Sequence, residues 1–384
     1  MRRLAAIAGL FRLPQPGVRP AAIAAVALVA VASGLTGLTL SATVRQQSPQ
    51  KADMAELLLS YGPATGLIGN SWWQAAVALS TVETYAQTTG DISYDTAIAR
   101  AFVLHSAGRF ENGSDDDTAW WALVWLQAYD LTHVPSYLSM AETDADYIHQ
   151  AWDSTCGGGV WWQRSPRSYK NAITNELFLE LTAWLHNTIR GDTKYLAWAK
   201  AEWSWFDQSG MINKVSLVND GLDNNCQNNA QNTWTYNQGV ILAGLAQLYQ
   251  ATGDRALLAQ AERIARAAIS HLSVGGVLTE PCQDGSCGSS LDADTLSFKG
   301  IFVRDLKVLA VTAGTAQFNA FFIAQARSIE ARDTSKNHQL GMFWSGPIAD
   351  VTASSQASAL DALVASLDLP LAQLAFPGPG LALV

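Results

Sequence analysis

The sequence is poor in positive charge and has no basic cluster beyond its N-terminal segment. Its 24 Lys and Arg residues are outnumbered by 33 Asp and Glu residues, which gives a net charge of −9. Proteins that bind nucleic acid neutralise phosphates with clustered basic side chains, so we expect no nucleic acid partner. Fourteen tryptophans are present instead. Because flat aromatic faces suit sugar rings as well as cores, this acidic, aromatic-rich chain suits a neutral polysaccharide.

Sequence signatures of phosphate and metal sites are also lacking. The triplet Gly157–Gly159 is without the Lys and the spacing of a phosphate-binding loop, so we expect a tight turn or a close approach of backbone to substrate. The loop 219–232 is rich in Asn and Asp but does not have the spacing of an EF-hand. We therefore expect no metal and no other cofactor.

Residues 1–50 differ from the rest of the chain. Four arginines precede an uncharged stretch from Ala21 to Val44, which is typical of a secretory signal peptide or an uncleaved signal anchor. The length favours an anchor and the small residues at its end permit cleavage, so both alternatives stand. In either case the following domain enters an oxidising compartment, secreted or tethered to the outer face of a membrane. The tail 371–384 is apolar, but prolines interrupt it and it lacks the polar spacer of a lipid-anchor signal.

The chain has only four cysteines: Cys156, Cys226, Cys282 and Cys287. In an oxidising compartment they indicate two disulfides rather than a metal site. Cys282 and Cys287 are close enough to close one loop, which favours a second bond between Cys156 and Cys226. Four cysteines allow three connectivities, so this pairing is a preference.

Residues 51–370 show almost no alternating strand pattern. Apolar residues recur with helical period, and similar turns begin at 88, 131, 189 and 251, where Gly and Asp or Pro end one helix and start the next. The last three turns lie about 60 residues apart, which indicates a two-helix repeat. This pattern predicts an all-α domain of six helical hairpins closed into a toroid. The twelve helices are expected near 51–61, 71–88, 94–107, 118–131, 135–152, 171–188, 193–209, 235–252, 255–272, 299–313, 316–334 and 352–366.

Unusual polar and aromatic residues precede every second predicted helix. The segments read 69-GNSWWQAA-76, 114-SDDDTAWW-121, 156-CGGGVWWQ-163, 171-NAITNELF-178, 232-NTWTYNQG-239 and 298-FKGIFVRDL-306. Because helices in successive hairpins alternate in direction, the N-termini of every second helix lie at the same end of the ring. We therefore expect these segments to form one site.

This series of segments resembles glycoside hydrolase family 76, the α-1,6-mannanases, in order and in spacing from about residue 55 to 365. The resemblance implies an (α/α)6 toroid that acts on α-1,6-linked mannose with retention of configuration and without a metal. The adjacent aspartate pair of the family falls on Asp116 and Asp117. By this match Asp116 is the nucleophile and Asp117 the general acid/base.

The chemistry of two adjacent aspartates fits this assignment. A retaining glycosidase needs two carboxyl groups roughly 5 to 5.5 Å apart, and neighbouring Cα atoms about 3.8 Å apart allow that separation. The positive end of the following helix favours the ionised member. Asp115 is expected to cap the helix or to be solvated, and a register shifted by one residue would shift the roles with it. The sequon at Asn112 adjoins this pair, so we expect it to carry no glycan.

Further side chains are candidates for binding substrate. Within each Trp pair we expect one indole to face sugar and the other to face the core, since consecutive helical positions point about 100° apart. Glu176 is expected to be a structural cap partner, and a buried salt bridge is the alternative for the two basic candidates. The candidates are Trp72, Trp73, Trp120, Trp121, Trp162, Asn175, Tyr236, Asn237, Gln238, Lys299 and Arg304.

The sequence thus predicts a monomeric, retaining endo-α-1,6-mannanase whose partner is α-1,6-mannan. One alternative is a cell-wall transglycosidase that acts on mannose-containing glycans or anchors. Another is a catalytically silent mannan-binding protein on the same toroid. A scaffold protein would form an open solenoid instead of a closed ring.

Overall fold

The computed structural model describes residues 48–281, 283 and 293–369. The predicted signal or anchor segment, the C-terminal tail, Cys282 and Cys287 lie outside these residues. Among the described helices, none combines the length and the apolar character needed to span a bilayer.

Twelve α-helices form the described part of the chain, and all twelve agree with the sequence prediction to within a few residues. They are α1 (Pro49–Leu58), α2 (Trp72–Thr89), α3 (Asp95–His105), α4 (Asp115–Thr132), α5 (Pro135–His149), α6 (Ala172–Thr188), α7 (Lys194–Gln208), α8 (Thr235–Thr252), α9 (Arg255–His271), α10 (Thr295–Ala313), α11 (Asn319–Arg332) and α12 (Ala353–Ala365). Short 3-10 turns occur at Ile92–Tyr94, Ser106–Gly108 and Thr155–Gly157. Two antiparallel strand pairs complete the elements, β1 (Tyr61–Gly62) with β2 (Leu67–Ile68) and β3 (Ser273–Val274) with β4 (Val277–Leu278).

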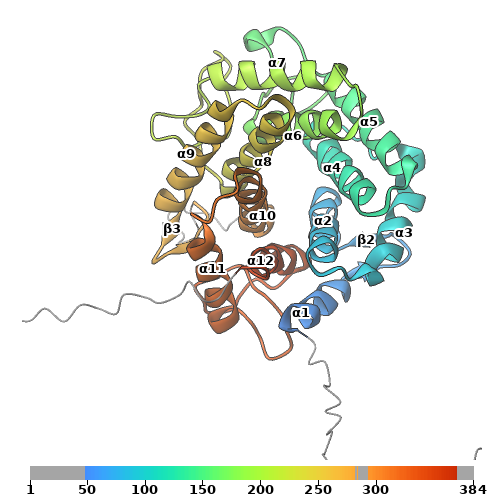
Figure 1. The fold of residues 1–384 in the computed structure, drawn as a ribbon, viewed down its shortest axis with the longest axis vertical. Coiled ribbons are helices and arrows are strands. Elements are labelled where there is room, and N and C mark those ends of the chain that lie inside the picture. Colours follow the sequence, from blue (N-terminus) through green and yellow to red (C-terminus); the bar gives the residue numbers. More distant parts are fainter. Residues whose placement is uncertain (1–47, 282, 284–292, 370–384) are drawn as a thin grey trace, which may run out of the picture. The chain divides into compact units, whose positions relative to one another are not determined.

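The even-numbered helices form a closed inner ring, and the odd-numbered helices lie outside it (Figure 1). Each inner helix packs on the next, from α2 through α4, α6, α8 and α10 to α12, and α12 packs back on α2. The prediction of an (α/α)6 toroid is therefore confirmed. An open solenoid would leave α2 and α12 apart, so this arrangement excludes one.

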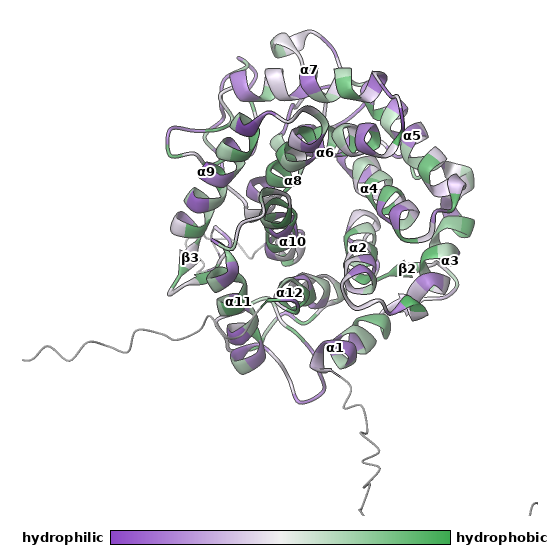
Figure 2. Ribbon diagram, in the orientation of Figure 1, coloured by the Kyte–Doolittle hydropathy of each residue, from purple (hydrophilic) through white to green (hydrophobic). Residues whose placement is uncertain are grey.

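Inner and outer helices differ in the way they are buried. The inner helix α4 is buried continuously from Thr118 to Ala128, because it contacts neighbours on almost every side. The outer helix α9 fully buries only one stripe, Leu257, Ala261, Ile264, Ala265 and Ala268, and its other residues are half-buried or exposed. Figure 2 shows the resulting alternation of hydrophilic and hydrophobic residues along α9.

Glycine allows the closest helix contacts and ends several helices. A Cβ on Gly300 would lie 2.4 Å from the Cα of Ser358, so α10 and α12 approach each other as closely as they do only because that side chain is absent. Gly90 and Gly253 end α2 and α8 in the left-handed conformation. These are the Gly-Asp turns that marked the repeat in the sequence.

Two helix starts differ from the prediction in a way that matters for the site. Helix α4 begins at Asp115 rather than 118, so all three aspartates lie in its first turn. Helix α10 begins at Thr295 rather than 299, which moves Lys299 from the helix start into its second turn.

Candidate active site

A pocket of about 140 Å³ lies where the N-terminal ends of the inner helices meet. The pocket lies at the end of the ring where the sequence predicted a site. The residues that line the pocket are Trp73, Ser114, Asp116, Asp117, Trp120, Trp162, Tyr236, Asp294 and Phe298.

Asp116 and Asp117 lie in the first turn of α4, directly after the N-cap residue Ser114. The backbone N–H of Asp117 donates to Oδ1 of Asp116 at 3.0 Å. The side-chain amide of Asn112 donates to Oδ2 of Asp117 at 2.7 Å. Free N–H groups and the helix dipole make this end of α4 favourable for negative charge. Each carboxylate is therefore held by a separate hydrogen bond.

Asn112 is itself fixed by three further hydrogen bonds. Its Oδ1 accepts from the backbone N–H of Ser114 at 2.7 Å, and its backbone carbonyl accepts from the hydroxyl of Tyr147 at 3.0 Å. Its backbone N–H donates to Oγ1 of Thr118 at 3.3 Å. The Nδ2 atom that glycosylation would modify is the donor to Asp117, which is a structural reason for the sequon to stay free.

Burial raises the pKa of both carboxylates. For Asp116 the pKa is well above its ordinary value because of burial and then because of the charge of Asp117. For Asp117 burial raises the pKa, the hydrogen bond from Asn112 lowers it, and the charge of Asp294 raises it. Two such neighbours resist double ionisation, so the pair retains a proton to higher pH than two isolated aspartates would.

The prediction for Asp115 was wrong, because this residue is neither a cap nor a solvated acid. Its side chain is fully buried and lies 2.9 Å from a guanidinium nitrogen of Arg164, which covers the ring of Tyr147 at 3.3 Å. Burial raises the pKa of Asp115 to about 7, and the charge of Arg164 opposes that rise. The backbone N–H of Asp115 also donates to the carbonyl of Trp162 at 2.8 Å. Asp115 therefore attaches the start of α4 to the loop that carries Trp162.

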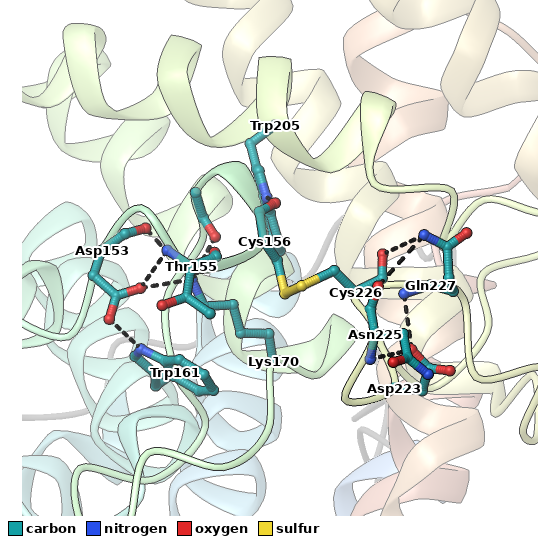
Figure 3. Close-up of a disulfide and its surroundings, with 11 residues drawn as sticks. Asp153, Thr155, Cys156, Trp161, Lys170, Trp205, Asp223, Asn225, Cys226 and Gln227 are labelled. Atoms are coloured by element: carbon teal, nitrogen blue, oxygen red, sulfur yellow. Dashed lines mark hydrogen bonds and ion pairs between the residues drawn. A yellow bond between two sulfur atoms is a disulfide. The ribbon is translucent and has the colours of Figure 1, made fainter.

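This loop, residues 153–170, is anchored at its base by a disulfide and a buried lysine (Figure 3). Cys156 is bonded to Cys226, as the sequence favoured. Lys170 is 2% exposed, and its ammonium donates to the carbonyl of Thr155 at 2.7 Å and to Oδ1 of Asp153 at 3.1 Å. These contacts fix the base of the segment from which Trp162 reaches the pocket.

The glycine triplet in this loop forms a tight turn, one of the two predicted outcomes, and its close contact is with Trp205. All three glycines have positive φ angles. A Cβ on Gly159 would lie 2.4 Å from the Trp205 ring, and a Cβ on Gly158 would lie 2.8 Å from it. The predicted alternative, a close approach of this backbone to substrate, is not what the triplet provides.

One indole of each tryptophan pair lines the pocket, and the other does not. Trp73 and Trp120 line it together, with ring centroids 6.0 Å apart, whereas Trp121 is fully buried. The predicted sugar contacts at Trp72 and Trp121 were wrong, because both rings pack in an aromatic cluster with Phe110. Trp162 lines the pocket as predicted.

Tyr236 lines the pocket, but the polar residues beside it in the sequence do not. Its ring stacks on Phe298 with centroids 3.8 Å apart. Asn237 is fully buried in the wall of α8. Gln238 accepts from the backbone N–H of Val218 and donates to the Val218 carbonyl. The predicted substrate contacts of Asn237 and Gln238 were therefore wrong.

Asn175 and Glu176 also serve the protein interior. The Asn175 amide holds the backbone of Val160 through both its oxygen and its nitrogen, at 2.7 and 3.1 Å, and donates its other N–H to the carbonyl of Asn171 at 2.7 Å. Asn175 is also fully buried, so the amide does not reach a sugar hydroxyl. Glu176 is fully buried, and burial raises its pKa well above the ordinary value. The helix is capped by Asn171 instead. The predictions of a sugar contact for Asn175 and of a cap partner for Glu176 were wrong.

Lys299 and Arg304 lie away from the pocket. Lys299 is fully buried, donates to the carbonyl of Met342 and to Oε1 of Gln283, and has its pKa lowered by burial to about 8. Arg304 lies 3.4 Å from Asp305 and 3.6 Å from Asp361, deeper in the ring. These positions contradict a role as substrate ligands in this pocket, and for Arg304 the predicted alternative of a buried salt bridge is correct.

Asp294, Phe298 and Asn112 contribute to the site but are not among the residues predicted from the sequence. Asp294 lies just before α10 and accepts a hydrogen bond from Nε1 of Trp73 at 3.0 Å. Phe298 belongs to one of the segments predicted to form the site. The predicted start of α10 at residue 299 placed Lys299, and not Phe298, in the first turn of the helix. Asn112 was noticed only as a sequon. A predicted start of α10 at Thr295 would have placed Asp294 and Phe298 at the helix N-terminus, where the other residues of the pocket lie.

The chain is similar in sequence to known proteins. The chain is 28% identical to mannan endo-1,6-alpha-mannosidase DCW1 of Saccharomyces cerevisiae, over 81% of this chain and 76% of that protein. It is also 28% identical to mannan endo-1,6-alpha-mannosidase DFG5 of the same yeast, over 74% of this chain and 68% of that protein.

Solved structures share the fold. The GH76A alpha-1,6-mannanase from Salegentibacter sp. HEL1_6 has a TM-score of 0.73 at 24% identity, over 83% of this chain and 98% of that one. An inactive variant of that enzyme, with two consecutive aspartates replaced by asparagine, was solved with alpha-1,6-mannotriose at the same similarity. Dfg5 from Chaetomium thermophilum, in complex with glucosamine, has a TM-score of 0.73 at 22% identity, over 83% of this chain and 88% of that one.

A sequence family also matches almost the whole of the helical domain. The match extends over residues 52–373 and so includes all the elements that form the pocket. The chain therefore belongs to glycosyl hydrolase family 76.

Proposed function

We propose that this protein is a retaining endo-α-1,6-mannanase that hydrolyses α-1,6-linked mannan backbones by double displacement. The observation that carries the proposal is that Asp116 and Asp117 line one pocket together, at the N-terminal end of α4 and among aromatic side chains. Relatives that bear the name mannan endo-1,6-alpha-mannosidase support the choice of bond. The inactive relative with two consecutive aspartates replaced supports the choice of residues.

In the first step Asp116 attacks the anomeric carbon while Asp117 protonates the glycosidic oxygen. The carbon–oxygen bond to the leaving chain breaks, and a glycosyl ester forms on Asp116. In the second step Asp117, now ionised, takes a proton from water, and the water oxygen attacks the same carbon and releases Asp116. Two inversions at one carbon give net retention.

The protonation state must match these roles at the moment of attack. Burial raises the pKa of both aspartates, and the charge of Asp117 raises that of Asp116 further. The proposal requires Asp117 to carry a proton and Asp116 to be ionised when the attack begins. The hydrogen bond from Asn112 fixes the direction in which Asp117 presents its other oxygen. The bond from the Asp117 backbone orients Asp116. One hydrogen bond therefore positions Asp117, and a separate hydrogen bond positions Asp116.

The aromatic walls are proposed to bind the sugar rings. Trp73, Trp120, Trp162 and Tyr236 offer indole and phenol rings around the carboxylates. Asp294 accepts from Trp73 and keeps that indole in place. We propose that the enzyme acts as a monomer, secreted or tethered outside the cell. The disulfide between Cys156 and Cys226 is typical of such an oxidising compartment.

The test is digestion of linear α-1,6-mannan, with linear α-1,2-, α-1,3- and α-1,4-linked glycans as comparison substrates. We expect internal cleavage of the α-1,6 polymer alone, with the α anomer formed first, as followed by product sizing and NMR. Asp116→Asn and Asp117→Asn should each abolish hydrolysis without loss of folding. Asp207→Asn, on the exposed surface of α7, is the matched control and should retain full activity.

Other outcomes would identify the alternatives. Transfer of mannose units to an added acceptor sugar, faster than release to water, would indicate a transglycosidase. Binding of mannan without any cleavage would indicate a silent binding protein. Retained hydrolysis in both aspartate variants would overturn the assignment of Asp116 and Asp117.

A further inference from the structure

A second cavity, distinct from the catalytic pocket, lies inside the ring near the C-terminal ends of the inner helices. Its volume is about 400 Å³, and all six inner helices contribute to its lining. Thr88 lies at the end of α2, Gln250 near the end of α8, and Thr312 at the end of α10. We refer to this cavity as the lumen. It opens on the ring face opposite the catalytic aspartates.

Trp120 lines both the lumen and the catalytic pocket. It is 4% exposed, so its indole is a shared wall between the two spaces. Arg304, which the sequence suggested as a substrate ligand, belongs to the lumen. Arg304, Asp305 and Lys307 of α10 therefore face a space that the catalytic reaction does not use.

The deep part of the lumen contains acids in excess over its one base. Arg304 is paired with Asp305 and Asp361, and Glu180 is the third acid beside it. The lining also contains the ion pair of Lys307 and Asp368. Glu180 is 7% exposed, and its carboxylate has no hydrogen-bond or ion-pair partner among the described residues. A buried acceptor without a partner is unfavourable unless a ligand or water satisfies it. The excess of acids also disfavours an anionic ligand.

The upper part of the lumen combines neutral amides with an aromatic face. Gln127 donates to Thr84 and to Gln87, Gln247 accepts from Asn187, and Gln250 donates to Thr312. Among the described residues this leaves the Nε2 atoms of Gln87 and Gln247 as donors and the Oε1 atoms of Gln127 and Gln250 as acceptors for a ligand. Trp184 presents its indole beside them. The Trp184 Nε1 atom donates to Asp130 at 3.1 Å, which fixes that ring. Apolar contacts come from Leu123, Val308 and Val364.

We propose that the lumen is a second binding site for a neutral hexose, separate from the catalytic pocket. Its volume is within the usual range for small-molecule sites. Amides that donate and accept, acids that accept from hydroxyls, and a flat indole together match a ring that bears several hydroxyl groups. The excess of acids in the lining selects against sugar acids. The argument does not depend on the activity of the catalytic pocket.

The experiment is equilibrium dialysis with mannose, set beside its amine mannosamine and its acid mannuronate. Val308→Trp fills the lumen from α10, and Glu180→Leu removes the carboxylate at similar size. Val103→Trp, 69% exposed on the outer helix α3, is the matched control for an added indole. Thermal unfolding verifies that each variant is folded, and hydrolysis of α-1,6-mannan is measured in parallel.

We expect Val308→Trp to bind one mannose fewer per chain than the wild type and Val103→Trp to bind the same number. Glu180→Leu should weaken that site at least tenfold, and mannuronate should bind it at least tenfold more weakly than mannose. Mannan hydrolysis should stay unchanged in all three variants, which separates this proposal from the fate of the proposed function. Equal mannose binding in Val308→Trp and wild type would overturn the site, and so would no binding to the wild type. Tenfold tighter binding of mannosamine would overturn its assignment to a neutral sugar.

Discussion

Removal of the hydrogen bond from Asn112 to Asp117 tests how the protonation of the proposed catalytic pair is controlled. The bond is 2.7 Å long and joins a fixed amide to a half-buried carboxylate. It lowers the pKa of Asp117 against the larger effect of burial. Asn112→Ala removes the donor, so the pKa of Asp117 should rise.

The size of the effect follows from the charge of the acceptor. A hydrogen bond to a charged group contributes about 1.5 to 3 kcal/mol, and partial exposure of Asp117 places the expected value at the lower end. Loss of this contribution should raise the pKa of Asp117. Loss of orientation should also lower kcat by about tenfold.

The assay is the pH dependence of kcat on α-1,6-mannan. An acid/base residue must be protonated to start the reaction, so activity falls as pH rises through its pKa. In Asn112→Ala this alkaline limb should move to higher pH, whereas in the exposed-loop control Asn337→Ala it should stay in place. An unchanged alkaline limb, or a shift of the acid limb alone, would refute the role given to Asp117.

Three further predictions address the nucleophile and the loop that carries Trp162. An activated fluoromannoside should trap a glycosyl ester on Asp116, and peptide mass spectrometry that finds it on Asp117 would reverse the roles. Replacing Cys156 and Cys226 together by Ser should lower the free energy of unfolding by about 4 kcal/mol, from the loop entropy of a 70-residue separation, as denaturant titration would measure. A loss below about 1 kcal/mol would show that the bond constrains little. Gly159→Ala places a Cβ 2.4 Å from the ring of Trp205 at a φ of +86°, so it should lower the melting temperature and weaken mannan binding, and a variant as stable as wild type would contradict that packing.

The architecture could be predicted from the sequence because it depends on periodicity and turn residues. Apolar spacing located all twelve helices, and Gly90 and Gly253 stand where the repeat placed helix ends. The alternation of helix direction then predicted that the functional segments would share one face. Each of these inferences uses a local sequence pattern and helix geometry, and none requires the direction of a single side chain.

The direction of single side chains could not be predicted in the same way. Asn175 and Gln238 lie in the segments that form the site, yet both amides bind the backbone of neighbouring loops. Asp115 adjoins the catalytic pair in sequence but is buried against Arg164. One residue along a helix changes the direction by about 100°, so neighbours in the sequence have different surroundings. Which loop backbone needs a partner depends on tertiary contacts that a local pattern does not contain.

The parallel orientation of the six inner helices has an electrical consequence for the whole ring. Their unpaired N–H groups converge on the face that holds Asp116 and Asp117, and their unpaired carbonyls converge on the opposite face. The domain is thus polarised from end to end, and carboxylates are tolerated best on the first face and cations on the second. Lys307, which lies toward the carbonyl end and donates to the Ala365 carbonyl at 3.1 Å, follows this polarity. The same acid pair transplanted to that opposite rim would meet a field that opposes its ionisation.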